Sequence, residues 1–413
     1  MWPNYPRKGV GLKENEMKTS NIVIMILGLF LAMGNIPAVW ADDGTVAALV
    51  QKNADLEKRI TALEAKPAAP ATGLQLPDYL KDLTMSGFVD TSYVYNVNHP
   101  DSGKNTARVF DTEANSFSLQ AAKLAFERLP AKTGGAGFRI DLMAGDDAQV
   151  TTPYGFDSSK FDVEQAYVDV IFPVGKGLDV KAGRFVTLAG AEVIESKDNW
   201  NYSRSLLFGY AIPFTHTGVR ASYPVLDTLT AYLGVNNGWD DVKDNNKGKT
   251  VESSVAWAPK DWFSTNIDIL YGPEEIGNNH SNRALFDFVV TFQPIKKLTL
   301  KVNVDYANEQ DAVALDKNGT WSGVAGYARY DFNDKWSVSD RIEYFADPNG
   351  LRIPGAVGQY LWENTPTLEF RPYKSLITRL EYRYDHSTDK VFTVASKAVP
   401  YQNTFSFEAI YVF

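Results

Sequence analysis

Several short segments carry charged residues at alternate positions, a spacing that places ionisable groups on one face of an extended strand. Arg139 and Asp141 form one such pair, and Arg341 and Glu343 form another. Opposite charges on a wetted wall can form ion pairs that stiffen it, or can set up an electric field across a water-filled space. Both interpretations stay open. The basic residues that we select for the second role are Arg139, Lys181, Arg184, Arg220, Arg341, Arg379 and Arg383.

The composition offers little for catalytic or metal chemistry. The chain has no cysteine, which excludes disulfides, thiolate catalysis and zinc–thiolate sites. Its four histidines have no nucleophile motif around them, and we find no pair of serine and histidine on one outward strand face. We therefore expect no enzyme, no cofactor and no metal. A formal net charge of -9 also argues against nucleic acid as a partner.

The charged positions belong to segments that alternate between apolar and polar residues from residue 83 to residue 413. "LTLKVNVDYA" is an example: the residues at 298, 300, 302, 304 and 306 are apolar or aromatic, and those between them are polar. A period of two is the period of a β-strand. We find no helical periodicity longer than a few turns in this region.

The connections between these segments alternate in length. Seven are short, such as "PVGKG" and "QPIKK", and eight are long, among them about residues 187–214 and 308–320, so they join sixteen strands. An even strand number with short turns at one end and long loops at the other is typical of a transmembrane β-barrel, which must close because lipid offers no partner to an open sheet edge. A soluble sandwich also explains the alternation, but not the regular connections. A propeller would need a blade-length repeat, which we do not find.

The C-terminal stretch "TFSFEAIYVF" alternates in the same way and has an aromatic residue as its last one. We expect this strand to close the barrel against the first strand. Aromatic residues such as Trp257, Trp262, Trp336 and Tyr373 fall beside short turns, where an interfacial girdle is expected.

The region before residue 83 has a different character. From Met17, the expected start, Lys18 and the apolar run 22–32 resemble an export signal that ends at Ala41, and the run is too short to span a bilayer. A genuinely longer leader within residues 1–41 is the alternative. Residues 42–66 show a heptad pattern with a polar Asn53 at a core position, which predicts a short periplasmic coiled coil or an amphipathic helix that packs on its own domain. Residues 67–82 are a Pro/Ala-rich linker.

The barrel region resembles the OmpL-like β-barrel porins of the outer membrane of Gram-negative bacteria. The resemblance rests on the order of several stretches, among them "SGFVDTSYVYN", "EQAYVDV", "VKAGRFVTLAGAEVIE", "NNGWDDVKDNN" and "RIEYFADPNGLR". None of these is a catalytic motif. The resemblance implies passive passage of solutes across the outer membrane and names no solute.

The third long connection, within residues 187–214, is the candidate constriction. It is rich in apolar and aromatic residues that would be buried if the segment folded into the barrel. An outer lid or packing against a neighbouring subunit is the alternative. If the segment folds inward, the charged residues along the solute path are Glu192, Glu195, Asp198 and Arg204.

Two functions fit this sequence. The first is an outer-membrane porin for small hydrophilic solutes or ions, located in outer-membrane lipid and lipopolysaccharide and assembled as a homo-trimer through the N-terminal helix. The second is a structural or partner-binding barrel, an adhesin or scaffold without an open channel. Channel conductance distinguishes them.

Overall fold

The structure is a computed structural model that describes residues 82–132, 134–156, 158–353 and 358–413. The expected leader, coiled coil and nearly all of the linker lie outside the described residues, so those three expectations stay predictions. Among the described residues, no helix combines the length and the apolar character that are needed to cross a membrane.

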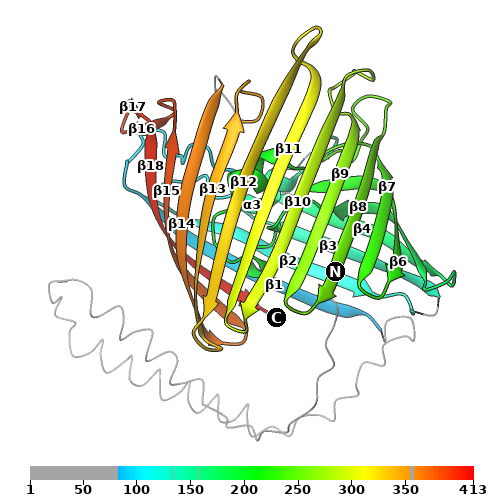
Figure 1. The fold of residues 1–413 in the computed structure, drawn as a ribbon. Coiled ribbons are helices and arrows are strands. Elements are labelled where there is room, and N and C mark those ends of the chain that lie inside the picture. The colour runs from blue at the N-terminus through cyan, green and yellow to red at the C-terminus, as the bar shows by residue number, and fades with distance from the viewer. Residues whose placement is uncertain (1–81, 133, 157, 354–357) are drawn as a thin grey trace, which may run out of the picture. The chain divides into compact units, whose positions relative to one another are not determined.

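Sixteen antiparallel strands of the described residues form one closed barrel (Figure 1). Each strand pairs with its neighbour in the sequence, and β1 also pairs with β18, as predicted. The strands are β1 (Thr84–Asn96), β2 (Ser116–Arg128), β3 (Gly135–Ala144), β4 (Phe161–Phe172), β5 (Leu178–Val186), β6 (Thr215–Leu226), β7 (Leu229–Asn236), β8 (Thr250–Lys260), β9 (Phe263–Pro273), β10 (Asn282–Ile295), β11 (Leu298–Ala314), β12 (Lys317–Asp331), β13 (Trp336–Asp347), β14 (Gln359–Tyr373), β15 (Leu376–Ser387) and β18 (Tyr401–Val412).

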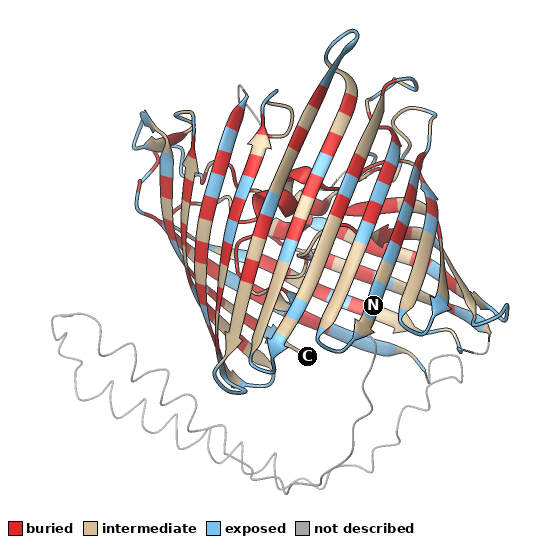
Figure 2. Cartoon of the chain, viewed as in Figure 1, coloured by how far each residue is buried: buried red, intermediate tan, exposed pale blue. Residues whose placement is uncertain are grey.

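The side chains alternate along each strand between an exposed apolar face and a buried polar face. On β13, Ile342 is 60% exposed and Tyr344 46%, whereas Arg341 and Glu343 between them are 0% and 1% exposed. The same alternation appears as stripes along the strands in Figure 2. Apolar residues outside and ionic residues inside reverse the arrangement of a soluble protein and suit a barrel surrounded by lipid.

The barrel closes where the last strand meets the first. The Gly87 amide donates to the Phe413 carbonyl at 2.9 Å, and the Phe413 amide donates to the Gly87 carbonyl at 3.0 Å. A Cβ atom at Gly87 would lie 2.4 Å from the Lys123 carbonyl oxygen and 2.7 Å from the Phe413 ring. Only glycine therefore fits at this position without a shift of the backbone.

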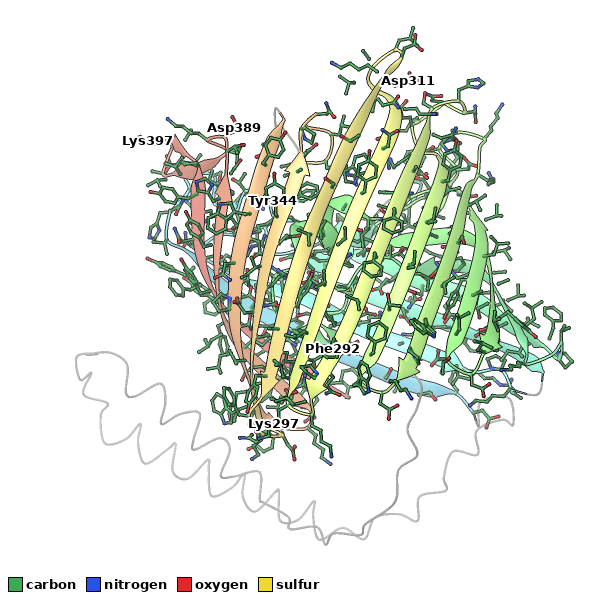
Figure 3. All side chains as sticks on the ribbon, viewed as in Figure 1. Phe292, Lys297, Asp311, Tyr344, Asp389 and Lys397 are labelled. Carbon is green, nitrogen blue, oxygen red and sulfur yellow. The ribbon has the colours of Figure 1, made fainter. Side chains whose placement is uncertain are left out.

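Aromatic side chains gather at the short-turn end of the barrel. Trp336 stacks on Phe370 with 4.2 Å between the ring centroids, and Trp262 meets Phe292 edge-to-face at 5.6 Å. Phe292 and Lys297 mark this end in Figure 3, and Asp311 marks the opposite end. The position suits an aromatic girdle at a membrane interface.

One connection differs from the expectation. Residues 308–320 were predicted to form a long loop, but β11 and β12 continue as a hairpin and leave only Leu315 and Asp316 between them. The pairing shifts between Glu309 and Ala314, and Asp316 has a φ of 60° at the tip. These strand ends are polar and lack the alternation from which the strands were predicted. A hairpin that extends beyond the lipid needs no apolar face.

The remaining elements lie in the long connections. They are the helix α3 (Asp146–Thr151), the single turns η2 (Ser196–Asp198) and η3 (Leu207–Ala211), and a small ribbon of β16 (Phe392–Val394) and β17 (Lys397–Val399). The two turns η2 and η3 belong to the third long connection.

Candidate functional site

The third long connection, residues 187–214 and called loop 3 from here on, packs against the polar face of the strands and therefore lies inside the barrel. Its helical turn is visible behind the front strands in Figure 1. The side chains of Ile194, Leu206, Leu207 and Phe208 are 0–3% exposed. Leu207 sits over Gly323 of β12, where an added Cβ would lie 2.7 Å from its Cδ2 atom.

Two glutamates of the wall accept hydrogen bonds from the loop 3 backbone. Both carboxylate oxygens of Glu343 are used, by the amides of Leu206 and Leu207, each at 2.6 Å. Glu381 accepts the amides of residues 202 and 203 at 2.7 and 3.0 Å. Charge-assisted bonds of this kind are stronger than neutral ones, so the two carboxylates fix the course of the loop.

Arg341 joins loop 3 to strands β13 and β14. Its guanidinium donates to Glu363 at 2.6 Å, to Glu192 of the loop at 2.7 Å and to the Ser203 carbonyl at 2.6 Å. Glu192 in turn accepts the amide of Ser205 at 2.7 Å. Because Arg341 is 0% exposed, its guanidinium does not project into open water.

Arg379 and Arg383 of β15 make similar contacts. Arg379 donates to Glu369 and Glu408 on the neighbouring strands at 2.9 and 2.8 Å, and to the loop carbonyls of residues 196 and 199 at 2.9 and 2.7 Å. Arg383 donates to the Arg204 carbonyl at 2.6 Å and is 1% exposed. Arg341, Arg379 and Arg383, called the arginine cluster from here on, thus contact loop 3 between residues 192 and 204.

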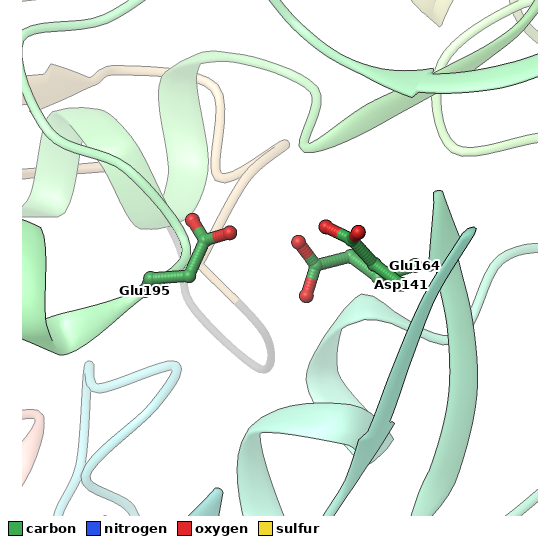
Figure 4. Close-up of side chains that lie close together, drawn as sticks. All are labelled: Asp141, Glu164 and Glu195. Carbon is green, nitrogen blue, oxygen red and sulfur yellow. The ribbon is translucent and has the colours of Figure 1, made fainter. Parts of the chain in front are cut away.

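A lysine fastens loop 3 to a second part of the wall, formed by β2, β3 and β4. Lys123 of β2 contacts Asp141 at 2.9 Å, Glu164 at 2.7 Å, and also Glu195 of the loop. Figure 4 shows Glu195 facing Asp141 and Glu164. Burial would raise the pKa of Glu195, but the Lys123 ammonium outweighs it and brings this pKa to about 2. The three carboxylates could hold a metal by spacing alone, yet they already surround a cation of the chain itself.

Arg204 connects two parts of loop 3 with each other and also reaches α3. Its guanidinium lies 3.2 Å from the Asp147 carboxylate of α3, and it also donates to the carbonyl of Ile194. Burial raises the pKa of Asp147 to about 7, although Arg204 opposes that rise. Loop 3 therefore contacts the second long connection as well as two parts of the barrel wall.

A row of three carboxylates lies on the wall beneath the start of loop 3. Asp268, Asp287 and Asp305 are paired in register on β9, β10 and β11 and are 0–2% exposed. Among the described residues, neither oxygen of Asp305 has a hydrogen-bond partner. None of the three forms an ion pair with a described residue, which is costly for a buried charge.

The other predicted basic residues lie away from the arginine cluster, on strands β3 to β6. Arg139 pairs with Asp141 at 2.9 Å and is one of the more exposed ones, with 27% of its side chain accessible. Lys181 lies over the Tyr167 ring, 4.8 Å from its centroid. Arg220 pairs with Glu252 at 2.6 Å.

Two further predicted residues differ widely in surroundings. Arg184 is buried and donates to Asp162 at 2.5 Å and to the Thr151 carbonyl of α3 at 2.9 Å. Asp198 of loop 3 has 55% of its side chain accessible and pairs with its neighbour Lys197 at 2.5 Å. Of the predicted loop acids, it is the one most open to solvent.

The sequence analysis missed Lys123 and Glu164 because each lies at or near an irregularity in the pairing of its strand. Asp90 of β1 pairs with Ala121 and the next residue with Leu119, so Gln120 is an extra residue. Glu164 is likewise left out of the pairing of β4 with β3. A bulge reverses the order of inward and outward residues, and strict alternation then assigns the wrong face. The small residues around Lys123 in "QAAKLAF" were the available sign of an inward lysine.

A closed antiparallel barrel with an apolar outside, an ionic inside and a loop folded into it has the architecture of a porin. The family comparison agrees: residues 82–413 match the model described as "Putative beta-barrel porin-2, OmpL-like". The chain belongs to this family, as the resemblance predicted.

Other comparisons concern the fold. No curated protein matches the sequence. Among solved structures, the anion-selective porin of Comamonas acidovorans has 12% identity and a TM-score of 0.56, with 80% of this chain and 99% of that chain covered. The trimer form of OmpT, an outer membrane protein of Vibrio cholerae, has 13% identity and a TM-score of 0.54 with the same coverage. The channel DcaP of Acinetobacter baumannii has 12% identity and a TM-score of 0.53, covering 80% and 97%. These identities show a shared fold alone.

Proposed function

We propose that the protein is an outer-membrane porin that lets small hydrophilic solutes or ions diffuse through a water-filled barrel narrowed by loop 3. The observation that carries the proposal is the attachment of loop 3, whose amides at 202, 203, 206 and 207 are held by Glu381 and Glu343. A segment fixed at this many points narrows a barrel in a defined way instead of moving freely in solvent. Family membership supports the same function.

We propose different roles for the charged residues inside the barrel. Arg341, Arg379 and Arg383 hold loop 3 in place and act on a passing solute through their field. Arg139 and Asp198, which are more exposed, contact the solution along the path. Glu192, Glu195 and Arg204 fix the loop to the walls.

The same proposal includes the protein's surroundings. The apolar exterior requires outer-membrane lipid, with lipopolysaccharide in contact with the long connections. Export would use the signal peptide predicted in residues 1–41, and assembly would give a homo-trimer, the state in which one of the similar structures is described. We propose no enzymatic activity, since the family is one of porins.

A structural or partner-binding barrel without an open channel is the alternative. One observation favours it: Arg341, Arg379 and Arg383, together with Ile194, Leu206, Leu207 and Phe208 of loop 3, are 0–3% exposed, so the interior is filled beside this part of the wall. A scaffold or adhesin would tolerate a completely filled interior, and a porin would not.

Single-channel recording in planar bilayers decides between the two. A porin should give steady ohmic steps, and the double variant Glu343→Gln/Glu381→Gln should give larger and more variable steps, because an amide oxygen binds loop 3 more weakly than a carboxylate. The matched control is Glu127→Gln. Glu127 pairs with Arg139 at 3.3 Å, and among the described residues it makes no hydrogen bond or ion pair with loop 3. Silence of the wild-type protein and of both variants would favour the scaffold. A salt gradient across the same bilayer should show a mild cation preference if the net charge of -9 governs selectivity.

A further inference from the structure

A cavity of about 370 Å³ lies at the short-turn end of the barrel, apart from loop 3. It is formed by the turns that join β10 to β11 and β12 to β13, together with the end of β14. Lys297 marks this place in Figure 3. Its size is in the range that proteins use for small ligands.

The residues that line this cavity carry more positive than negative charge. Five are basic and three are acidic, which gives a net charge of +2 in a chain whose net charge is -9. We call this cavity the basic pocket. Its basic residues are Lys296, Lys297, Arg329, Lys335 and Arg371.

Two of the three acidic residues of the basic pocket, Glu369 and Asp331, are already used by arginines, whereas Asp334 forms no ion pair with a described residue. Glu369 accepts from Arg329 at 2.9 Å, from Arg371 at 2.8 Å and from Arg379 at 2.9 Å. Asp331 accepts from Arg329 at 3.0 Å. One carboxylate shared by three guanidinium groups leaves the surroundings positive.

The lysines of the basic pocket are not used in this way. Among the described residues, Lys296 and Lys335 form no ion pair, and the Lys297 ammonium donates to the Phe332 carbonyl at 2.9 Å. Arg371 uses its Nε atom toward Glu369, and within the described part of the chain its two Nη atoms have no hydrogen-bond partner. Several donors of positive charge therefore face the same cavity without an anion.

The side chains of the basic pocket come from the short turns and from the polar face of the strands. Glu369 and Ser337 lie on that polar face and are 2% and 3% exposed, whereas the turn residues Lys296, Lys297 and Lys335 are exposed. Trp336, which stacks on Phe370, borders the pocket on its other side. A solute at the short-turn end of the barrel can therefore reach the lysines.

We propose that the basic pocket binds soluble oxyanions with more than one negative charge, of the phosphate and pyrophosphate class. Separate lysine ammonium groups and an arginine fork suit an anion that has several oxygen acceptors, while a single chloride could satisfy only one or two of these donors. The pocket would hold such a solute at the short-turn mouth, which we assign to the periplasm because barrels of this kind have short periplasmic turns. The location at a mouth rests on the proposed function, but binding itself does not require an open channel.

The test uses the full chain in zwitterionic detergent and titrates it calorimetrically with inorganic pyrophosphate. The triple variant Lys296→Gln/Lys297→Gln/Lys335→Gln should weaken binding at least about tenfold, since each charge-assisted contact contributes more than a neutral one. The matched control, Lys132→Gln/Lys260→Gln, removes lysines from other short turns and should bind as the wild type does. Retained binding in the triple variant, or equal loss in the control, would overturn the proposal.

Three further measurements make the interpretation unambiguous. Heat-dependent migration on gels shows whether each variant still forms the barrel, and Arg371→Lys serves as a milder second variant if the triple variant does not. Repeating the pyrophosphate titration in nanodiscs of anionic phospholipid tests for a lipid headgroup: loss of pyrophosphate binding through competition by this lipid would contradict a soluble ligand. Conductance in potassium chloride is recorded separately. An open channel that does not bind pyrophosphate contradicts only this inference, and a silent barrel that binds it contradicts only the proposed function.

Discussion

At the scale of single residues, the interior of this barrel is held by carboxylates and cations that have little water around them. Lys123 has 3% of its side chain accessible and contacts three carboxylates, and Arg341 is 0% exposed between Glu363 and Glu192. Removing one partner of such a buried pair is costly because the other charge is left uncompensated. These residues therefore determine the position of loop 3 more strongly than exposed charges do.

The contact between Lys123 and Glu195 makes the attachment of loop 3 dependent on pH. The pKa of Glu195 lies at about 2, below its ordinary value of 4.5, so its contribution to stability is complete above pH 4.5 and is lost as the pH falls toward 2. We expect Glu195→Gln to lower the free energy of unfolding by roughly 1–3 kcal/mol at pH 6 and by much less near pH 2. Thermal unfolding in liposomes at both pH values measures this.

The control for this prediction is Asp198→Asn in the same loop, because 55% of that side chain is accessible. It should change stability by less than about 0.5 kcal/mol at either pH. A difference between Glu195→Gln and the wild type that does not depend on pH would show that the charge of Glu195 is not what holds the loop.

Burying the carboxylate of Asp305 costs folding free energy, and a single substitution should remove this cost. Its carboxylate is 1% exposed, faces Asp287 on the next strand, and has no hydrogen-bond partner among the described residues. We expect Asp305→Asn to stabilise the barrel by about 1–3 kcal/mol at pH 7, because the amide has a similar shape and no charge. Urea unfolding measures this, with the exposed Asp334→Asn as the control. A loss of stability would mean that Asp305 has a cationic partner in solution.

At the scale of elements, the strands are specified by the face that meets lipid. On β13 the exposed positions are apolar along the middle of the strand, and the aromatic Trp336 lies at its short-turn end. The inner face tolerates arginine and glutamate because it meets loop 3 and not lipid. The strand period, more than any single residue, thus decides which side chain is allowed where.

The depth of an outward residue should determine how much a charge costs there. We expect Ile342→Arg, in the middle of β13, to destabilise the barrel by roughly 2–4 kcal/mol, since an arginine at the bilayer midplane is poorly solvated. Tyr373→Arg is the matched control: it is also outward, with 66% exposure, but lies at the end of β14 and should cost about 0–1 kcal/mol. Equal costs in a refolding titration with lipid vesicles would contradict the assignment of the lipid-facing surface.

At the scale of the whole molecule, stability depends on closure of the sheet. The pairing of β1 with β18 joins the two ends of the described barrel, from Phe88 with Val412 to Asn96 with Thr404. An open edge would leave these backbone groups without partners in lipid, at several kcal/mol each. Closure is thus a property of the full set of strands and not of any single hairpin.

Shortening the last strand should therefore prevent assembly. We expect deletion of residues 411–413 to abolish the heat-modifiable, protease-resistant form of the protein, because it removes the reciprocal hydrogen bonds between Gly87 and Phe413 as well as part of the β1 pairing. Deletion of residues 314–317 at the hairpin tip is the control and should leave that form intact, since the tip lies beyond the barrel wall. A resistant form after the C-terminal deletion would contradict this account of closure.

The sequence by itself determined the strand number, the inward and outward faces of the regular strands and the two ends of the barrel, because lipid imposes a period of two and closure imposes an even set of paired strands. It also identified loop 3 through apolar residues that must be buried. Only the tertiary structure showed which carboxylate meets which cation. The bulges at Gln120 and Glu164 shift the faces of β2 and β4, and the contact of Lys123 with Glu195 joins residues that are far apart in the chain. Such contacts depend on the shape of the closed barrel, which no local pattern of residues encodes.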